Sequence, residues 1–439
     1  MPRTLLSGGR IIDPASGRDA PGDVVIEGNR IAAVTEAGAA EAETRFDCTG
    51  LLVLPGLVDP HVHLREPPPV AAGAGAEATD SLPETIATGA AAAAAGGFAT
   101  VCAMPNTQPP VDSAEAVAAT IERGREAGAA RVLVAGCLTR GRAGREPADL
   151  EGMRRAGAVA FTDDGSDVAD DAVFEACLRE AARLDVPVLC HCEDATLVGG
   201  GVVHAGPMAE RLGVPGIPPE AEVAAVRRAC LAAERTGCHV HIMHVSTEGA
   251  VEQVRRAKRR VAAVTAEATP HHLALTVDAL AGGDAVFRVN PPLRTGRDAE
   301  AVAAGVRDGT IDCLASDHAP HPASAKARPL TQAPAGMIGL ESALAIYIDT
   351  LIRTQGLEWL DLAARLTAGP ARALGLAPPA LAAEAPADVT VIDPEARWRI
   401  EPERFASRAR NCPFAGREVR GQAIRTLVAG RTVFERFTA

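Results

Sequence analysis

Short apolar runs alternate with longer, alanine-rich amphipathic segments from about residue 56 to about residue 380. The apolar runs have the length of buried strands, and the segments between them have the length and composition of helices. The pattern predicts eight strands, ending near His63, Asn106, Leu138, Asp164, His191, His244, His271 and Asp317. Helices are expected over residues 83–95, 113–127, 170–184, 220–236 and 249–260. Eight β/α repeats are the number that closes a (β/α)8 TIM barrel, so an α/β fold of this class is expected.

The two ends of the chain follow a different pattern. Short β-like runs, separated by Gly, Pro and Asn, lie at residues 10–12, 23–28 and 30–34 and again at 387–394 and 424–433. Such short strands need partners, so the two ends are predicted to meet in one small composite β-sandwich domain. The expected division assigns residues 1–55 and 381–439 to this domain and residues 56–380 to the barrel.

Composition and charge narrow the class of protein. The chain has 439 residues, of which 47% are apolar and only 3% aromatic, so its core must consist mainly of Ala, Val, Leu and Ile. A net charge of −12 argues against a nucleic-acid partner and against an anionic membrane surface. An early glycine pair, the lack of a long apolar run and ten cysteines without a paired framework favour a cytoplasmic protein.

Histidines are concentrated at the predicted strand ends. The chain has eleven histidines, and all but His204 lie at or beside one of these ends. His61 and His63 are two residues apart, so both imidazoles can lie on one face of a strand. In a barrel the carboxyl ends of all the strands meet at one rim, which is where active sites are built.

This rim would collect nitrogen and oxygen ligands suited to two divalent ions. The set would consist of four histidines and two carboxylates, among the candidates His61, His63, His191, His244, the Asp163–Asp164 pair and Asp317. Such ligands are typical of zinc, and a carboxylate can bridge two ions. Two zinc ions would bind a hydroxide and make it a nucleophile toward a carbonyl group. A carboxylate beside them, for which Asp317 is suitably placed, would serve as general base and acid.

Eight motifs occur in order along nearly the whole chain. They are residues 55–67 (PGLVDPHVHLREP), 104–107 (MPNT), 161–165 (FTDDG), 191–194 (HCED), 241–247 (HIMHVST), 269–273 (TPHHL), 290–294 (NPPLR) and 316–321 (SDHAPH). In these motifs the chain resembles the bacterial type I dihydroorotases of the amidohydrolase superfamily. The resemblance implies the reversible cyclisation of N-carbamoyl-L-aspartate to (S)-dihydroorotate and water, a step of pyrimidine biosynthesis.

The resemblance also implies a role for each site residue. His61, His63 and Asp317 would bind one zinc ion, His191 and His244 the other, and Asp164 would bridge the two. Asp317 would also transfer the proton. The substrate would be held by His63, Arg65, Asn106, Asn290, His321, Ala335 and Gly336. A carboxylate on the substrate suits a bidentate arginine and amide donors.

The lysine content distinguishes a dihydroorotase from other cyclic amidohydrolases. Hydantoinases and allantoinases, the alternative cyclic amidohydrolases, often bridge their metals with a carboxylated lysine on the fourth strand. This chain has only two lysines, Lys258 and Lys326, and neither lies there. The bridge is therefore expected to be Asp164, which favours a dihydroorotase.

A third alternative is an inactive dihydroorotase-like scaffold for aspartate transcarbamoylase. Such a chain would be expected to lose metal ligands, whereas this chain keeps all six. Association of an active enzyme with aspartate transcarbamoylase, and formation of a homodimer, are left open by the sequence.

The chain departs from the family pattern in three places. Pro68, Pro69 and an Ala/Gly-rich insertion follow the arginine motif, where the family has a short turn. Ala335 occupies a position at which the family tends to have phenylalanine, so the apolar wall should be smaller. Ala325 replaces the usual glutamate before Lys326.

Several neighbours of the motifs are given supporting roles. Asp163 is expected to orient its turn, and His318 is expected to support the ligands without binding metal. His271 and His272 either orient ligands or substrate or are purely structural. Cys190 and Cys192 should lie on the opposite strand face from His191 and serve packing.

Overall fold

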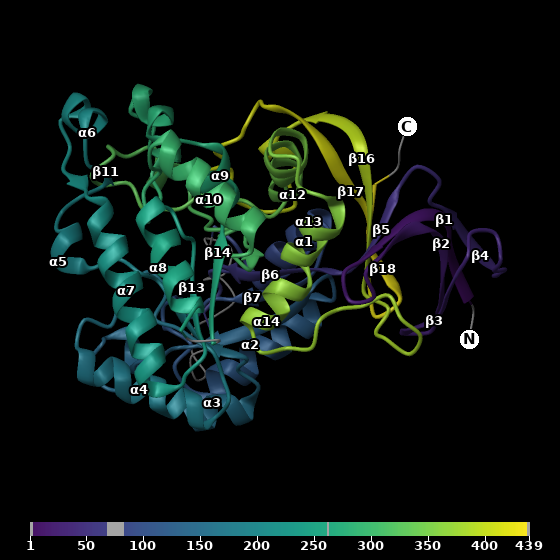
Figure 1. Cartoon of the computed structure of the whole chain (residues 1–439), viewed down its shortest axis with the longest axis horizontal. Helices are drawn as coiled ribbons and strands as arrows, with labels where there is room; N and C mark the ends of the chain where they lie inside the picture. Colours follow the sequence, from purple (N-terminus) through teal and green to yellow (C-terminus); the bar gives the residue numbers. More distant parts are fainter. Residues whose placement is uncertain (1–2, 68–82, 261–262, 437–439) are drawn as a thin grey trace.

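The computed structural model describes residues 3–67, 83–260 and 263–436, and its larger part is a parallel β/α barrel (Figure 1). Eight parallel strands pair in the order β15-β14-β13-β10-β9-β8-β7-β6. Their bounds are β6 Leu57–Val62, β7 Phe98–Ala103, β8 Arg131–Gly136, β9 Ala160–Phe161, β10 Val188–Cys190, β13 Val240–Ile242, β14 Val264–Ala268 and β15 Cys313–Leu314. A bridge between Val62 and His318 joins the first strand to the segment after the last one. The predicted barrel and its eight strands are confirmed, and each strand ends slightly before the residue at which its end was predicted.

Helices surround the barrel and follow the expected pattern. The five predicted helices are α1 Ile86–Ala95, α2 Ala114–Ala127, α4 Asp171–Arg183, α7 Pro219–Thr236 and α8 Glu248–Lys258. In α4, Phe174, Cys177, Leu178 and Ala181 are buried at helical spacing, which gives the helix one apolar face for the barrel. The side chain of Asp170 caps its first turn.

The remaining helices complete the ring or form the loops above its rim. The longer ones are α3 Leu150–Ala156, α6 Pro207–Leu212, α10 Gly296–Asp308, α13 Trp359–Leu366, α14 Ala368–Ala373 and the π-helix η5 Ile348–Thr354. The shorter ones are α5 Ala195–Val198, α9 Pro270–Ala274, α11 Ala323–Lys326, α12 Ala343–Tyr347, η2 Arg140–Arg142, η3 Val277–Gly282, η4 Ala285–Phe287 and η6 Pro402–Arg404. A small pair, β11 Val203–His204 and β12 Gly216–Ile217, was not predicted.

The two ends of the chain form a second eight-stranded sheet beside the barrel (Figure 1). Its strands pair in the order β18-β17-β16-β5-β1-β2-β3, and β4 also pairs with β1. Their bounds are β1 Arg3–Asp13, β2 Arg18–Glu27, β3 Arg30–Thr35, β4 Thr44–Asp47, β5 Leu52–Pro55, β16 Val389–Arg399, β17 Glu418–Val428 and β18 Arg431–Glu435. The N-terminal and C-terminal halves meet where β5 pairs antiparallel with β16. The predicted composite β unit is thereby confirmed.

Two buried threonines attach this sheet to the barrel. Thr390 Oγ1 donates a hydrogen bond to the Gly97 carbonyl at 2.7 Å and accepts one from the Leu57 amide at 3.3 Å. Thr426 Oγ1 donates to the Ala94 carbonyl at 2.7 Å. Only Gly56 separates β5 of the sheet from β6 of the barrel. The sheet therefore fixes the beginning of the strand that carries His61.

Other predictions concern the chain as a whole. All ten cysteines are free and buried, as expected for small core residues. Among the described residues, no helix combines the length and the apolar character needed to cross a membrane. The insertion predicted at residues 68–80 lies outside the described residues.

The contact between sheet and barrel can be tested with Thr390→Val. The substitution keeps the shape of the side chain but leaves the buried Gly97 carbonyl and Leu57 amide without their partner. We expect the free energy of unfolding to fall by about 1–3 kcal/mol, as measured by urea denaturation of metal-free protein. Thr44→Val, at an exposed strand position, is the matched control and should change stability by less than about 0.5 kcal/mol. Equal effects of the two variants would contradict the assignment.

Candidate active site

The six predicted ligands lie together at the carboxyl ends of five barrel strands. His61 is the next-to-last residue of β6, and His63 follows that strand directly. The other four occupy the loops just beyond β9, β10, β13 and β15, namely Asp164, His191, His244 and Asp317. All six are buried. The structure therefore brings together every residue of the predicted set.

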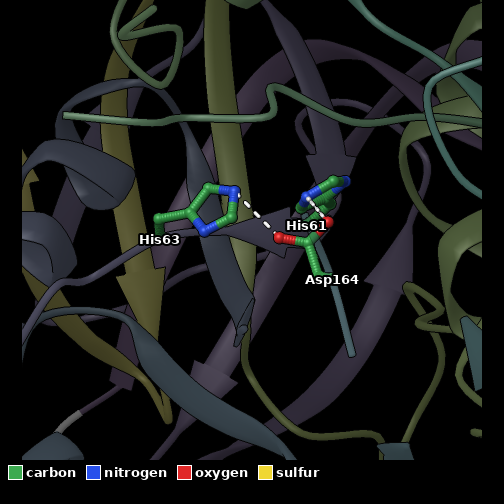
Figure 2. Close-up of side chains that lie close together, drawn as sticks. All are labelled: His61, His63 and Asp164. Carbon is green, nitrogen blue, oxygen red and sulfur yellow. Dashed lines mark ion pairs between the residues drawn. The ribbon is translucent and has the colours of Figure 1, made fainter. Parts of the chain in front are cut away.

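The first group of donors surrounds the Asp164 carboxylate. Figure 2 shows the imidazoles of His61 and His63 directed toward its two oxygens. His61 Nε2 lies 3.7 Å from Oδ1, and His63 Nε2 lies 3.5 Å from Oδ2. Asp317 Oδ1 lies 3.4 Å from His61 Nε2 and 3.3 Å from His63 Nε2.

A second group of donors lies on the other side of the same carboxylate. His191 Nδ1 is 3.7 Å from Asp164 Oδ1 and 2.9 Å from His244 Nε2. Asp164, His191 and His244 together form a set of ligand atoms close enough to share one ion, as do His61, His63 and Asp164. Asp164 is common to both sets, which is the position of a bridging ligand.

The spacing and bonding of these atoms fit a metal. Ligand atoms about 2.1 Å from a tetrahedral ion lie roughly 3.4 Å from one another. The separations of 3.3–3.7 Å around His61, His63, Asp164 and Asp317 are close to this value. His61 Nε2 is buried and has no hydrogen-bond partner among the described residues, as expected for an atom that would bind a metal. The residues present therefore fit a metal pair.

The opposite ring nitrogens of three ligands are held by neighbouring side chains. His61 Nδ1 lies 2.7 Å from Glu267 Oε1, and His191 Nε2 lies 3.1 Å from Glu193 Oε2. His63 Nδ1 lies 2.9 Å from Asn106 Oδ1. Such partners fix the tautomer and the direction of a metal-binding imidazole.

Glu267 was missed by the sequence analysis. It is fully buried in β14, and its second oxygen lies 3.0 Å from His241 Nε2. A charged residue inside a strand of small residues, just before the 269–273 motif, was the available signal. Glu193 lies within a quoted motif but had been given no role.

The electrostatics of the site favour positive charge. Burial opposes protonation of His61, yet Asp317 and Glu267 raise its pKa to about 10. Burial also opposes protonation of His191, but its interactions with Asp164 and Glu193 raise the pKa to about 10. Burial alone would raise the pKa of Asp164, but His63 and His191 hold it well below the ordinary value. The site therefore provides ionised carboxylates and a potential that a divalent cation would satisfy.

Backbone strain occurs at the same place. Arg65, His244 and Asp317 adopt the left-handed conformation, with φ values of 58°, 34° and 46°. Non-glycine residues in this region cost about 1–3 kcal/mol each and cluster at functional sites. The surrounding packing therefore holds these three side chains in directions that a relaxed backbone would not give.

A cavity of about 230 Å³ opens onto the ligands. All seven residues predicted to hold the substrate line it: His63, Arg65, Asn106, Asn290, His321, Ala335 and Gly336. Arg65 Nε donates to the Pro320 carbonyl at 3.1 Å, and burial lowers the pKa of this guanidinium to about 10, so it stays charged at neutral pH. Asn290 Oδ1 is buried without a hydrogen-bond partner. The cavity therefore combines a cation and amide groups beside the ligand cluster.

A residue from the C-terminal segment supports this cavity and was also missed. Asn411, between β16 and β17, donates from Nδ2 to the Ala319 carbonyl at 3.1 Å and to the Gly336 carbonyl at 3.2 Å. Its Oδ1 accepts a hydrogen bond from the His321 amide at 3.2 Å. The sequence carried no signal for this role, because Asn411 lies 90 residues beyond His321.

Asp163 and His318 are both buried and make hydrogen bonds with neighbouring residues. Asp163 accepts hydrogen bonds from the amides of Leu138 and Thr139, both at 3.0 Å, and so orients its turn. His318 Nε2 lies 3.1 Å from the Glu84 carboxylate.

The two histidines of the 269–273 motif differ from each other. His271 Nε2 lies 3.8 Å from Asp317 Oδ2, so this residue faces the site. His272 Nε2 donates to the Pro291 carbonyl at 3.0 Å and is structural.

The fold has close counterparts among solved structures. The L-hydantoinase of Arthrobacter aurescens superposes with a TM-score of 0.84 at 24% identity, covering 99% of this chain and 96% of its own. The dihydropyrimidinase of Brevibacillus agri gives 0.81 at 22% identity, covering 99% and 95%. The chain therefore shares the fold of these two enzymes.

Sequence relatives identify the family. A family model described as dihydro-orotase-like matches residues 50–250. The dihydroorotase of Syntrophotalea carbinolica is 45% identical over 98% of this chain and 99% of its own length. That of Pelotomaculum thermopropionicum is 44% identical over 99% of both chains. The chain belongs to the dihydroorotase family.

The central position of Asp164 can be tested with Asp164→Ala. Loss of a carboxylate shared by both donor sets should weaken metal binding roughly tenfold or more, since even indirect supports of a metal site contribute that much. Metal content after dialysis, measured by mass spectrometry, should fall clearly below that of the wild type. The exposed Asp171 is suitable for a control, and Asp171→Ala should keep the full content. Wild-type metal content in Asp164→Ala would exclude Asp164 as a ligand.

Proposed function

We propose that this chain is an active dihydroorotase, which interconverts N-carbamoyl-L-aspartate and (S)-dihydroorotate in pyrimidine biosynthesis. The observation that carries the proposal is one cavity lined both by the metal-type ligands and by Arg65. Dihydroorotate has a ring amide to be attacked and a carboxylate to be recognised, and the cavity provides groups for both.

We propose two zinc ions as the cofactor. His61, His63 and Asp317 would hold one, His191 and His244 would hold the other, and Asp164 would bridge them. When bound, zinc lowers the pKa of water toward neutrality and polarises the carbonyl that is attacked. Support comes from the donor separations and from the carboxylate and amide partners on the opposite ring nitrogens.

The protein side chains would then move one proton and orient the substrate. Burial would raise the pKa of Asp317, but His61 and His63 keep it well below its ordinary value, so the carboxylate is in the ionised form that proton transfer requires. In ring opening it would take the proton from the attacking water and deliver it to the departing ring nitrogen. Arg65, with Asn106 and Asn290, would hold the substrate so that the amide carbonyl lies over the ligand cluster.

The alternatives receive less support. Hydantoinases are only 22–24% identical to this chain, whereas dihydroorotases reach 44–45%. Neither lysine reaches the metal ligands: Lys258 pairs with Asp312, and Lys326 donates to backbone carbonyls. A carboxylated lysine bridge is thus not available, and Asp164 lies in its place.

Further parts of the proposal rest on the sequence. The division into residues 1–55, 56–380 and 381–439, a cytoplasmic location, a homodimer and association with aspartate transcarbamoylase belong here as predictions. The retained ligand set favours an active enzyme over an inactive scaffold for that transcarbamoylase.

Purified, zinc-loaded protein tests the function directly. The protein should consume dihydroorotate near neutral pH, and the loss of ultraviolet absorbance measures this reaction. Dihydroorotate should be consumed faster than hydantoin or allantoin. No turnover of dihydroorotate, or faster turnover of either alternative ring, would contradict the proposal.

The role of Asp317 predicts the behaviour of Asp317→Asn. The amide keeps one oxygen ligand but cannot accept the proton, so the variant should retain more zinc than Asp164→Ala. Its turnover should fall by about 10²- to 10⁴-fold, the usual contribution of a general acid–base group. Metal analysis and steady-state kinetics on the same sample separate the two effects. Unchanged turnover would remove Asp317 from proton transfer.

A further inference from the structure

A buried lysine lies behind one wall of the cavity. Lys326 is the last residue of α11, and only 8% of it is exposed. Its Nζ atom donates hydrogen bonds to the carbonyl oxygens of Arg288 at 3.1 Å, Pro334 at 3.0 Å and Gly336 at 2.9 Å. An ammonium group has three N–H donors, and these three carbonyls use all of them. The charge is thus buried among neutral partners, which is costly and unusual for a lysine.

The backbone that Lys326 holds is the wall of the cavity itself. Ala335 and Gly336 line the cavity, whereas Lys326 does not. In the chain, Ala335 lies between Pro334 and Gly336, whose carbonyls bind Lys326. The Ala335 carbonyl accepts a hydrogen bond from His321 Nε2 at 2.8 Å. A Cβ atom on Gly336, whose φ is 133°, would lie 2.8 Å from the same His321 nitrogen. Three consecutive carbonyls and the His321 ring are therefore packed as one unit.

This arrangement orients an amide group of the wall. In a trans peptide the N–H points opposite to the carbonyl of the same unit. The bond from Lys326 to the Pro334 carbonyl therefore turns the Ala335 N–H to the side away from Lys326, and of these residues Ala335 lines the cavity whereas Lys326 does not. Arg65 Nη2 lies 3.4 Å from His321 Nε2, next to this wall. A guanidinium and an amide N–H on the same side suit a carboxylate.

We propose that Lys326 is a positioning residue for recognition of the substrate carboxylate. Its ammonium group holds residues 334–336 so that this wall and Arg65 together receive the carboxylate that dihydroorotate carries on its ring. The inference rests on the proposed dihydroorotase function and adds a residue that does not itself touch the substrate.

The surroundings of Lys326 make this support dependent on pH. Burial and then the Arg288 guanidinium lower the pKa of Lys326 to about 7, while Asp284 acts in the opposite direction. The third neighbouring titratable group is His321, whose pKa burial lowers to about 3, so it stays neutral. Lys326 can donate three hydrogen bonds only as the ammonium form. This form is fully populated well below pH 7 and is lost as the pH rises through 7. The KM for dihydroorotate should therefore rise above pH 7.

Lys326→Met, with Lys258→Arg as control, tests the inference in zinc-loaded enzyme. Lys326→Met should raise the KM for dihydroorotate about 10- to 100-fold, the range for hydrogen bonds to a charged group, while kcat changes less than about threefold. It should also abolish the rise of KM above pH 7. Lys258→Arg keeps its pairing with Asp312 and should behave as the wild type. A KM equal to that of the wild type, or an equal loss in kcat, would overturn the proposal.

Lysine side-chain NMR gives a readout that needs neither catalysis nor a stable Lys326→Met protein. The chain has only two lysines, so ¹³Cε-labelled wild type should show two signals, of which Lys258→Arg removes one. The Lys326 signal should titrate near pH 7, at the midpoint of the rise in KM, and should shift when dihydroorotate binds. Titration near the ordinary lysine value would overturn the inference. If the Lys326 signal of the wild type titrates near pH 7 but the enzyme does not turn over dihydroorotate, that result would contradict the proposed function alone.

Discussion

The closure of the barrel is the constraint on which the active site depends. The His63 amide donates to the His318 carbonyl at 2.8 Å, and Asp59 in β6 accepts hydrogen bonds from the Ser316 amide, 257 residues later in the chain. These contacts place Asp317 beside His61 and His63. The ligand set comes from five strands, so it exists only when the first and last strands meet.

Closure also buries charges, and the structure compensates for each of them locally. Isolated buried carboxylates are costly, but Glu267 contacts both His61 and His241, and Glu193 contacts His191. The same contacts that lower this cost also direct the metal-binding nitrogens toward Asp164. Stability and ligand geometry therefore have a common origin, because the same partners, which lie on strands and their adjoining turns, serve both.

The composite β unit contributes more than an attachment of the chain ends. Through Thr390 it fixes the start of β6, and through Asn411 it holds the Gly336 carbonyl that Lys326 also binds. One side of the cavity thus depends on a segment that follows the barrel in sequence. The start of the first barrel strand and the substrate wall are thus both supported by the C-terminal segment.

The sequence by itself predicted the eight strands and the position of the rim, and together with the family resemblance it predicted the six candidate ligands. It could do so because strand length, alternation and the position just after a strand are local properties, and parallel strands necessarily place their carboxyl ends together. It could not identify Glu267 as the partner of His61, 206 residues away, nor Asn411 and Lys326 as supports of the cavity wall. Those contacts depend on strand register, on loop packing and on the direction of backbone carbonyls, which only the tertiary structure decides.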